Sequence, residues 1–176
     1  MSALEKALSH SKKIGIDECD IIRVKKKITT VRITDSEIVE VKQNFDDSFG
    51  IRMIHDKKIT SMETTNEDEI EKIMLEALRA SSNLKSREFW GGLPFKTNHS
   101  KLEGTFDEKL EQISGSKCMD IAQDMINSAD NDKVNAITGS LHVVSENFEL
   151  MNSNGLDFTE KSTYISEFLM QSQNTE

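Results

Sequence analysis

Hydrophobic and polar residues alternate with a period of two through residues 19–65, and this pattern limits the possible folds more than any other feature. The alternation is carried by Ile22 and Val24, Val31 and Ile33, Val39 and Val41, then Phe49, Ile51 and Met53, and more weakly by residues 59–64. Short turn-like clusters interrupt it at residues 35–37, 46–48 and 55–58. Connections this short leave no room for the crossover helix that parallel strands require. We therefore predict an antiparallel meander with one hydrated face.

Helices are predicted on both sides of this meander. Ser2 and Glu5 have the spacing of a capping box, and Gly15 supplies a left-handed stop, so the first helix falls within residues 2–15. After the meander, Thr65 or Asn66 can cap a second helix, whose apolar stripe recurs at helical spacing. The stripe consists of Ile70, Ile73, Met74, Ala77 and Leu78. We interpret it as a core-facing surface.

Residues 83–106 lose periodicity and contain the only proline and the only tryptophan, Pro94 and Trp90. We interpret this stretch as a linker, with Phe89 and Trp90 packing it down. The pattern then starts again: residues 106–126 are predicted to be helical with an interruption at 114–116, and four period-two segments follow at 137–143, 148–151, 156–158 and 164–170. Asn154-Gly155 predicts a two-residue hairpin loop, because both residue types accept positive φ.

Each half thus reads as a helix followed by strands, which predicts an α+β fold with helices packed on an antiparallel sheet. The expected organisation is an N-terminal α+β subdomain at residues 1–85, a linker at 86–105 and a second α+β subdomain at 106–176. Residues 31–36 align with residues 148–153 in their apolar and turn positions. This similarity is explained equally well by a weak internal duplication and by two hairpins that share generic patterning.

The formal net charge of -9 is unevenly distributed along the chain. Residues 1–88 carry 16 basic and 17 acidic side chains, whereas residues 89–176 carry 6 basic and 14 acidic ones. A nucleic-acid partner is not expected, because such binding needs a basic face that displaces counterions from phosphates. The one dense basic cluster, Lys25-Lys26-Lys27, is better explained as a solvated strand face or an edge protected by lysine than as a nucleic-acid contact.

Local catalytic motifs are absent from the sequence. No two of the four histidines, His10, His55, His99 and His142, lie within two helical turns of each other, so no zincin-type helix is encoded. Cys19 and Cys118 form no close pair, and neither phosphate loops nor a G-x-S-x-G elbow occur. No apolar run reaches the length of a membrane span, and the N-terminus lacks the layout of a signal peptide. We therefore expect a cytoplasmic protein without a membrane partner.

The order of these motifs resembles the N-terminal and middle region of the TldD/PmbA family, known as modulators of DNA gyrase. The resemblance rests on Lys12-Lys13-Ile14-Gly15, Cys19-Asp20-Ile21-Ile22-Arg23-Val24, Val31-Arg32-Ile33-Thr34-Asp35-Ser36-Glu37, Phe49-Gly50-Ile51-Arg52-Met53-Ile54, Glu76-Ala77-Leu78-Arg79-Ala80 and Met151-Asn152-Ser153-Asn154-Gly155-Leu156. The stretch Gly91-Gly92-Leu93-Pro94 is more similar to the PmbA (TldE) branch than to TldD.

This resemblance implies a zinc metallopeptidase system that degrades unfolded or short peptides. Family members are longer, and TldD and PmbA proteins form a heterodimer in which the TldD subunit carries an HExxxH zinc motif. This chain has no such motif. The resemblance therefore implies a non-catalytic region that acts in substrate binding and subunit assembly, with no cofactor of its own and with zinc in the partner subunit. The expected partners are a TldD-type subunit or a second copy, and an extended peptide. The alternative is a stand-alone interaction module that acts on gyrase or on a toxin–antitoxin pair.

Four residues are candidates for substrate or partner binding. Arg52 follows Gly50 in a predicted strand and can anchor a carboxylate through its forked donors, although a surface or interface salt bridge is the simpler explanation. Asp35 and Asn152 occupy corresponding turns, where Asx residues ordinarily hydrogen-bond their own backbone. An exposed strand edge in such a meander can accept an extended peptide by strand addition.

Overall fold

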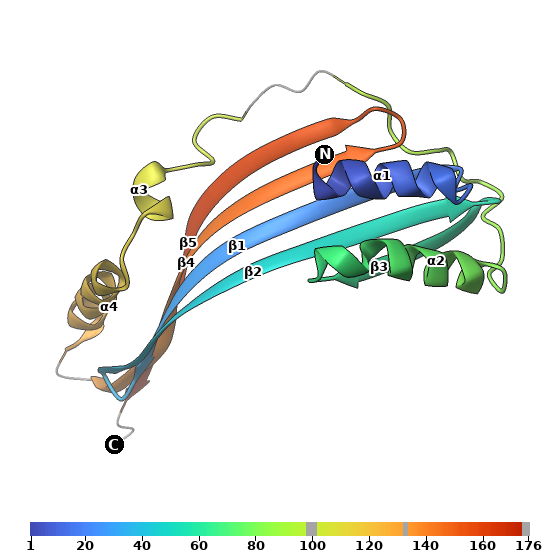
Figure 1. The fold of residues 1–176 in the computed structure, drawn as a ribbon. Coiled ribbons are helices and arrows are strands. Elements are labelled where there is room, and N and C mark those ends of the chain that lie inside the picture. The colour runs from blue at the N-terminus through green and yellow to red at the C-terminus, as the bar shows by residue number, and fades with distance from the viewer. Residues whose placement is uncertain (98–101, 132–133, 174–176) are drawn as a thin grey trace. The chain divides into compact units, whose positions relative to one another are not determined.

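The structure is a computed structural model that describes residues 1–97, 102–131 and 134–173. It has an α+β fold in which helices accompany a five-stranded antiparallel sheet of order β3-β2-β1-β4-β5 (Figure 1). In chain order the elements are α1 (Ala3–Lys13), β1 (Glu18–Thr34), β2 (Glu37–His55), β3 (Lys58–Thr64), a 3₁₀ turn η1 (Glu67–Glu69), α2 (Ile70–Ser81), α3 (Glu108–Glu111), α4 (Gly115–Ala129), β4 (Val134–Asn152) and β5 (Asp157–Gln173). The fold class predicted from the sequence is confirmed.

The strands are fewer and longer than the sequence pattern indicates. The turn predicted at residues 46–48 is wrong, because these residues lie inside β2. There, the Asp47 carboxylate accepts two hydrogen bonds from Arg23 of β1, at 2.8 and 2.7 Å. Two consecutive acidic residues are typical of a turn, but here the ion pair between Asp47 and Arg23 of the neighbouring strand keeps the segment in the sheet. In the same way, the four short segments of the second half merge into β4 and β5.

The turns between strands depend on residues with positive φ. Asp35 and Ser36 connect β1 to β2 with φ of 51° and 62°, and Asp56 and Lys57 connect β2 to β3 with φ of 51° and 58°. Positive φ at both central positions is characteristic of the turns that match strand twist, although glycine and asparagine fill them at lower cost. These two-residue connections explain why β1, β2 and β3 are sequential neighbours in the sheet.

The predicted two-residue loop at Asn154-Gly155 needs correction. Four residues, 153–156, separate β4 from β5, and Gly155, with φ of 82°, is the loop residue in the left-handed region. The side chain of Asn152 closes this loop, because its Oδ1 accepts hydrogen bonds from the backbone amides of Asn154 and Leu156, both at 2.9 Å. The backbone closes the loop as well, since Asn152 N donates to Leu156 O at 3.0 Å and Gly155 N donates to Asn152 O at 3.2 Å.

The described residues form two compact units, each built from several segments of the chain. Unit 1 comprises residues 1–25, 46–101 and 147–160, and unit 2 comprises residues 26–45, 102–146 and 161–176. These units are not the consecutive segments 1–85 and 106–176 expected from the sequence. Each of the strands β1, β2, β4 and β5 contributes residues to both units. The boundaries of the two subdomains and of the linker stay a prediction.

The core of unit 1 lies between α1, α2 and one face of its strands. The predicted capping box of α1 is present, with Glu5 N donating to the Ser2 hydroxyl at 3.2 Å. Asn66 Oδ1 accepts from Asp68 N at 3.1 Å and so caps the turn that precedes α2. The buried core residues are Ala3, Leu4, Ala7, Ile16, Cys19, Ile21, Phe49, Ile51, Met53, Ile70 and Met74. The two helices therefore cover one face of the sheet in this unit.

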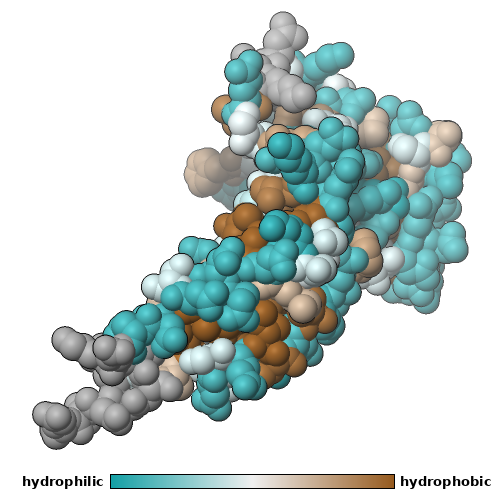
Figure 2. Space-filling view, turned by 90° about the vertical axis from the view of Figure 1, so that its left-hand side faces the viewer, coloured by the Kyte–Doolittle hydropathy of each residue, from teal (hydrophilic) through white to brown (hydrophobic). Residues whose placement is uncertain are grey.

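Unit 2 has its own core beneath α4. Ser114 caps this helix by accepting from Lys117 N at 3.1 Å. The helical region is interrupted as predicted, but at residues 112–114, between α3 and α4, rather than at 114–116. The buried core consists of Val31, Ile33, Cys118, Ala122, Ile126, Ile137, Leu141 and Val143. Not every large apolar side chain is buried, however. Hydrophobic side chains gather at the surface on the face of the molecule drawn in Figure 2.

Candidate functional site

A groove of about 740 Å³ lies in unit 1 and is floored mainly by three neighbouring strands. Side chains on a strand alternate between the two faces of the sheet. On the face that packs against α1 and α2 lie the side chains of Cys19, Ile21, Phe49 and Met53. The even-numbered residues between them therefore point away from the helices. Those that line the groove are Asp20, Ile22 and Val24 of β1, Ser48, Gly50 and Arg52 of β2, and Phe148, Leu150 and Asn152 of β4.

The groove has an apolar floor and polar ends. Ile22, Val24, Phe148 and Leu150 are all half-buried, so they remain accessible on the side without helices. Gly50 deepens the floor, since a Cβ there would meet Ile22 Cγ1 at 3.0 Å. A side chain at this position would therefore project into the space that the groove occupies.

Arg52 lies at a polar end of the groove, next to Asp20. Its Nε donates to Asp20 Oδ2 at 3.1 Å and its Nη2 donates to the same oxygen. The guanidinium carbon also lies 6.0 Å from the ring centre of Trp90. The salt bridge considered for Arg52 from the sequence is thus present within the chain, and it fixes the guanidinium at the groove.

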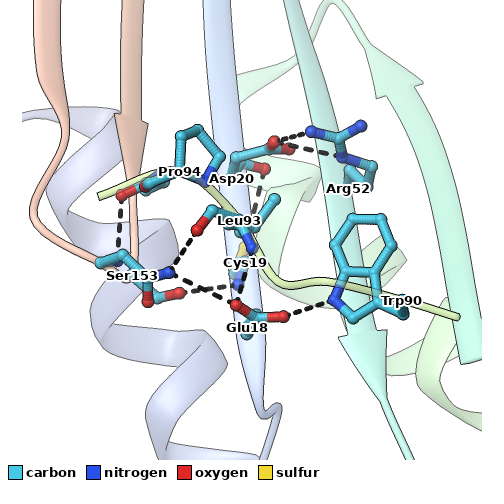
Figure 3. Close-up of polar contacts among 10 residues, drawn as sticks. Glu18, Cys19, Asp20, Arg52, Trp90, Leu93, Pro94 and Ser153 are labelled. Carbon is cyan, nitrogen blue, oxygen red and sulfur yellow. Dashed lines mark hydrogen bonds and ion pairs between the residues drawn. The ribbon is translucent and has the colours of Figure 1, made fainter. Parts of the chain in front are cut away.

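Trp90 and the residues after it run along unit 1 as a strap, which we define as residues 90–94. Glu18 holds this strap: its carboxylate accepts from Trp90 Nε1 at 2.6 Å, from Leu93 N at 2.8 Å and from Asn154 Nδ2 at 3.3 Å (Figure 3). The Trp90 hydrogen bond lowers the pKa of Glu18 below its ordinary value, and the Leu93 and Asn154 bonds act in the same direction. Partial burial opposes them. Glu18 therefore stays ionised at neutral pH as the anchor of the strap.

Asparagine side chains from the β4–β5 connection hold the other end of the strap. Asn152 Nδ2 donates to Pro94 O at 2.8 Å, and Asn154 Nδ2 donates to Leu93 O at 2.8 Å. Ser153 N donates to Cys19 O at 2.8 Å, and its hydroxyl accepts from Cys19 N at 3.1 Å. Asn152 is thus the turn-forming Asx residue expected from the sequence, and it also fixes Pro94 at the groove wall.

The structure brings three of the four predicted residues together. Gly50, Arg52 and Asn152 all line the groove, whereas Asp35 lies in the β1–β2 turn of unit 2 and is not part of it. Sequence reasoning missed Glu18. The sequence feature that could have indicated it was Trp90, the single tryptophan, which lies in a stretch without regular secondary structure. Such a side chain needs a specific acceptor, but the sequence does not identify it. Phe89 does not pack as predicted, since it is 99% exposed.

The described residues contain no group of three histidine, cysteine, aspartate or glutamate side chains that could hold a metal ion. His142 sits between two hydroxyls, with Nδ1 3.0 Å from Thr30 Oγ1 and Nε2 3.0 Å from Ser140 Oγ, and His99 lies outside the described residues. Both cysteines are buried and unpaired with each other, and burial raises the pKa of Cys19 to about 12. The Cys19 thiol is therefore protonated and unreactive.

Comparisons with known proteins match this geometry to one family. Residues 19–81 match the model described as PmbA/TldA metallopeptidase domain 1. Among curated protein sequences there is no match. No helix within the described ranges combines the length and apolar character needed to cross a bilayer.

Three solved structures share the fold over nearly the whole chain. TldE from Thermococcus kodakarensis is 17% identical with a TM-score of 0.78, over 99% of this chain and 40% of that one. A proposed modulator of DNA gyrase from Bacteroides thetaiotaomicron is 14% identical with a TM-score of 0.86, over 99% and 41%. Another, from Thermotoga maritima, is 20% identical with a TM-score of 0.76, over 98% and 39%. The chain thus spans about two fifths of the length of these proteins. Residues 19–81 are thus similar to the first domain of the PmbA/TldD family, and the whole chain shares the fold of these three structures.

Proposed function

We propose that this chain is the non-catalytic, substrate-binding and assembly portion of a PmbA/TldD-type metallopeptidase, and that its unit 1 groove receives extended peptide segments. The observation that carries the proposal is the groove itself. It is an apolar strip of sheet surface without a covering helix, with the Asp20–Arg52 pair at a polar end and the strap beside it.

The shape of the groove suits an extended chain rather than a compact ligand. Ser61, Met62 and Glu63 of β3 also line it, and β3 is the terminal strand of the sheet order, with no further strand beside it among the described residues. A peptide that lies on this uncovered face can place its apolar side chains on the floor and its polar groups against Asp20 and Arg52. Apolar contacts of this kind tolerate many sequences, which fits a protease that takes unfolded segments.

Hydrolysis is assigned to another subunit in this proposal. The residues described here do not offer the ligand set of a zinc site, and the Cys19 thiol is held protonated. What this chain supplies is position: the floor orients apolar side chains, and Asp20 and Arg52 present a fixed pair of opposite charges to the polar groups of the peptide.

Trp90 provides the assay, because it is the single tryptophan and is half-buried at Arg52 and Glu18. Titration with an unstructured peptide of alternating apolar and polar residues should change its fluorescence and saturate. Leu150→Glu, which puts a charge on the floor, should weaken this binding about tenfold or more, because a buried carboxylate there would have no partner. Leu75→Glu, at an exposed position on α2, is the matched control. Equal binding by both folded variants would refute the groove as the peptide site.

The rival function is a stand-alone interaction module, favoured by the description of two structural neighbours as proposed modulators of DNA gyrase. Co-expression with a full-length TldD-type subunit separates the two. Stable association supports the peptidase portion, whereas failure to associate together with stable binding to gyrase supports the interaction module.

A further inference from the structure

The charges that line the unit 1 groove do not balance. Three of the described residues on its wall are charged, namely Asp20, Arg52 and Glu63. Two carboxylates against one guanidinium formally leave one negative charge in excess. Because the remaining lining residues are apolar or neutral, the position of this excess charge decides which peptides the groove favours.

The charge of Arg52 is taken up by Asp20. Arg52 donates from both Nε and Nη2 to the same carboxylate oxygen of Asp20, whose side chain is only 14% exposed. On β3 the residue opposite Arg52 is Ser61, so Glu63 lies diagonal to Arg52 and does not face it. The Asp20–Arg52 pair is therefore neutral as a unit, and the excess negative charge belongs to Glu63.

Glu63 has an open position on both sides. The residue opposite it on β2 is Gly50, so no side chain faces Glu63 across the strand pair. On its other side no further strand follows β3 among the described residues. The residue is exposed, and its carboxylate forms no ion pair with any described side chain. A cation that enters the groove can therefore approach this carboxylate without displacing an internal partner.

We propose that Glu63 sets the charge preference of the groove, which selects extended segments that combine apolar residues with a lysine or arginine and disfavours acidic segments. Long basic side chains suit this arrangement, because their aliphatic stems can lie on the apolar floor while the charged head reaches the carboxylate. Arginine can also bind a carboxylate through two hydrogen bonds. The inference rests on the proposed function of the groove as a peptide site and adds the class of peptide.

Peptides that differ only in charge test this preference. Three fluorescently labelled versions of one unstructured peptide alternate apolar residues with lysine, glutamine or glutamate, and anisotropy measures their binding to the full chain. The lysine peptide should bind about three- to fivefold more tightly than the glutamine peptide, and the glutamate peptide about as much more weakly, as expected for one partly exposed ion pair. Salt at about 1 M should reduce these differences, because it screens exposed charges.

Replacement of Glu63 locates the preference. Glu63→Lys should reverse the order of the three peptides, and Glu63→Gln should bring their dissociation constants close together. Glu76→Lys is the matched control, since it changes the net charge by the same amount at an exposed position on α2. It should keep the wild-type order. Circular dichroism melts establish that each variant is folded before its binding is compared.

The possible failures of the two proposals differ. If the glutamine peptide binds but Glu63→Lys leaves the order of the three unchanged, the inference about Glu63 is overturned and the groove remains a peptide site. The same holds if all three peptides bind the wild-type chain equally. If Glu76→Lys alters the order as much as Glu63→Lys does, the preference arises from net charge and not from Glu63. If no peptide binds, the proposed function fails and this inference fails with it.

Discussion

Replacement of Glu18 by glutamine should release the strap while leaving the rest of unit 1 folded. In the wild-type protein the two carboxylate oxygens accept from Trp90 Nε1 at 2.6 Å and from Leu93 N at 2.8 Å, with Asn154 adding a third bond at 3.3 Å. Glutamine replaces one oxygen by an NH₂ group, so one of these donors faces another donor and the remaining bonds lose their charge assistance.

The size of this effect follows from the bonds affected. Hydrogen bonds to a charged group contribute about 1.5–3 kcal/mol and neutral ones about 0.5–1.5 kcal/mol. The loss of one charged bond, or the weakening of two, therefore shifts the strap equilibrium by about 2 kcal/mol, or roughly 30-fold towards release. Trp90 reports this directly. Its emission in Glu18→Gln should move to longer wavelength at neutral pH, as its ring becomes hydrated.

Acid should produce the same change in the wild-type protein. The pKa of Glu18 is lowered in the folded state from its ordinary value of 4.5, chiefly by the Trp90 hydrogen bond. A lowered pKa stabilises the strap above pH 4.5, and this stabilisation is lost as pH falls from there through the folded-state pKa. The emission of Trp90 should therefore shift on acidification in the wild type but not in Glu18→Gln.

Glu88→Gln is the matched control, since Glu88 is exposed in the same stretch of chain. It should leave both the neutral emission and its acid titration unchanged. If Glu18→Gln has the wild-type emission at neutral pH, or still shows the acid titration, then the carboxylate of Glu18 does not hold the strap.

Three stability predictions follow from other contacts, each checked by denaturant unfolding. Lys57→Gly should stabilise the protein by about 0.5–1 kcal/mol, because Lys57 has a φ of 58°, whereas Lys57→Ala should not, because alanine also disfavours that φ. Arg23→Ala should cost about 1–2 kcal/mol, through loss of a two-pronged ion pair in which the Arg23 side chain is 19% exposed and that of Asp47 42%. Arg32→Ala, whose single-pronged ion pair is more exposed on both sides, should change stability by less than about 0.5 kcal/mol. Met74→Ala should cost about 2–5 kcal/mol, since Met74 is fully buried, and Leu75→Ala, at an exposed position, should cost much less.

The predictions that succeeded rest on local chemistry. The capping box at Ser2 and Glu5 and the interruption at Ser114 involve groups three residues apart, so the chain alone specifies them. The predictions that failed depended on partners distant in sequence. The acidic pair at residues 46–47 is a turn signal by itself, and only the approach of Arg23 from β1 converts it into the middle of a strand.

The residues of the candidate site show the same difference between local and distant contacts. Gly50 and Arg52 were identified as binding candidates because an arginine that follows a glycine in a predicted strand can anchor a carboxylate through its forked donors. Glu18 was missed because its role depends on Trp90, 72 positions later in the chain. No local pattern links a carboxylate at the start of the first strand to an indole in an irregular stretch.

By itself, the sequence determined the alternation that makes antiparallel strands and the stops and caps that bound most of the helices, since these follow from torsional preference and hydrogen bonding within a few residues. Only the tertiary structure decided that the short segments would merge into long strands, which of their faces would stay uncovered, and which carboxylate would hold the strap. Those outcomes depend on contacts between groups far apart in the chain, and their free energy exists only once the sheet has brought them together.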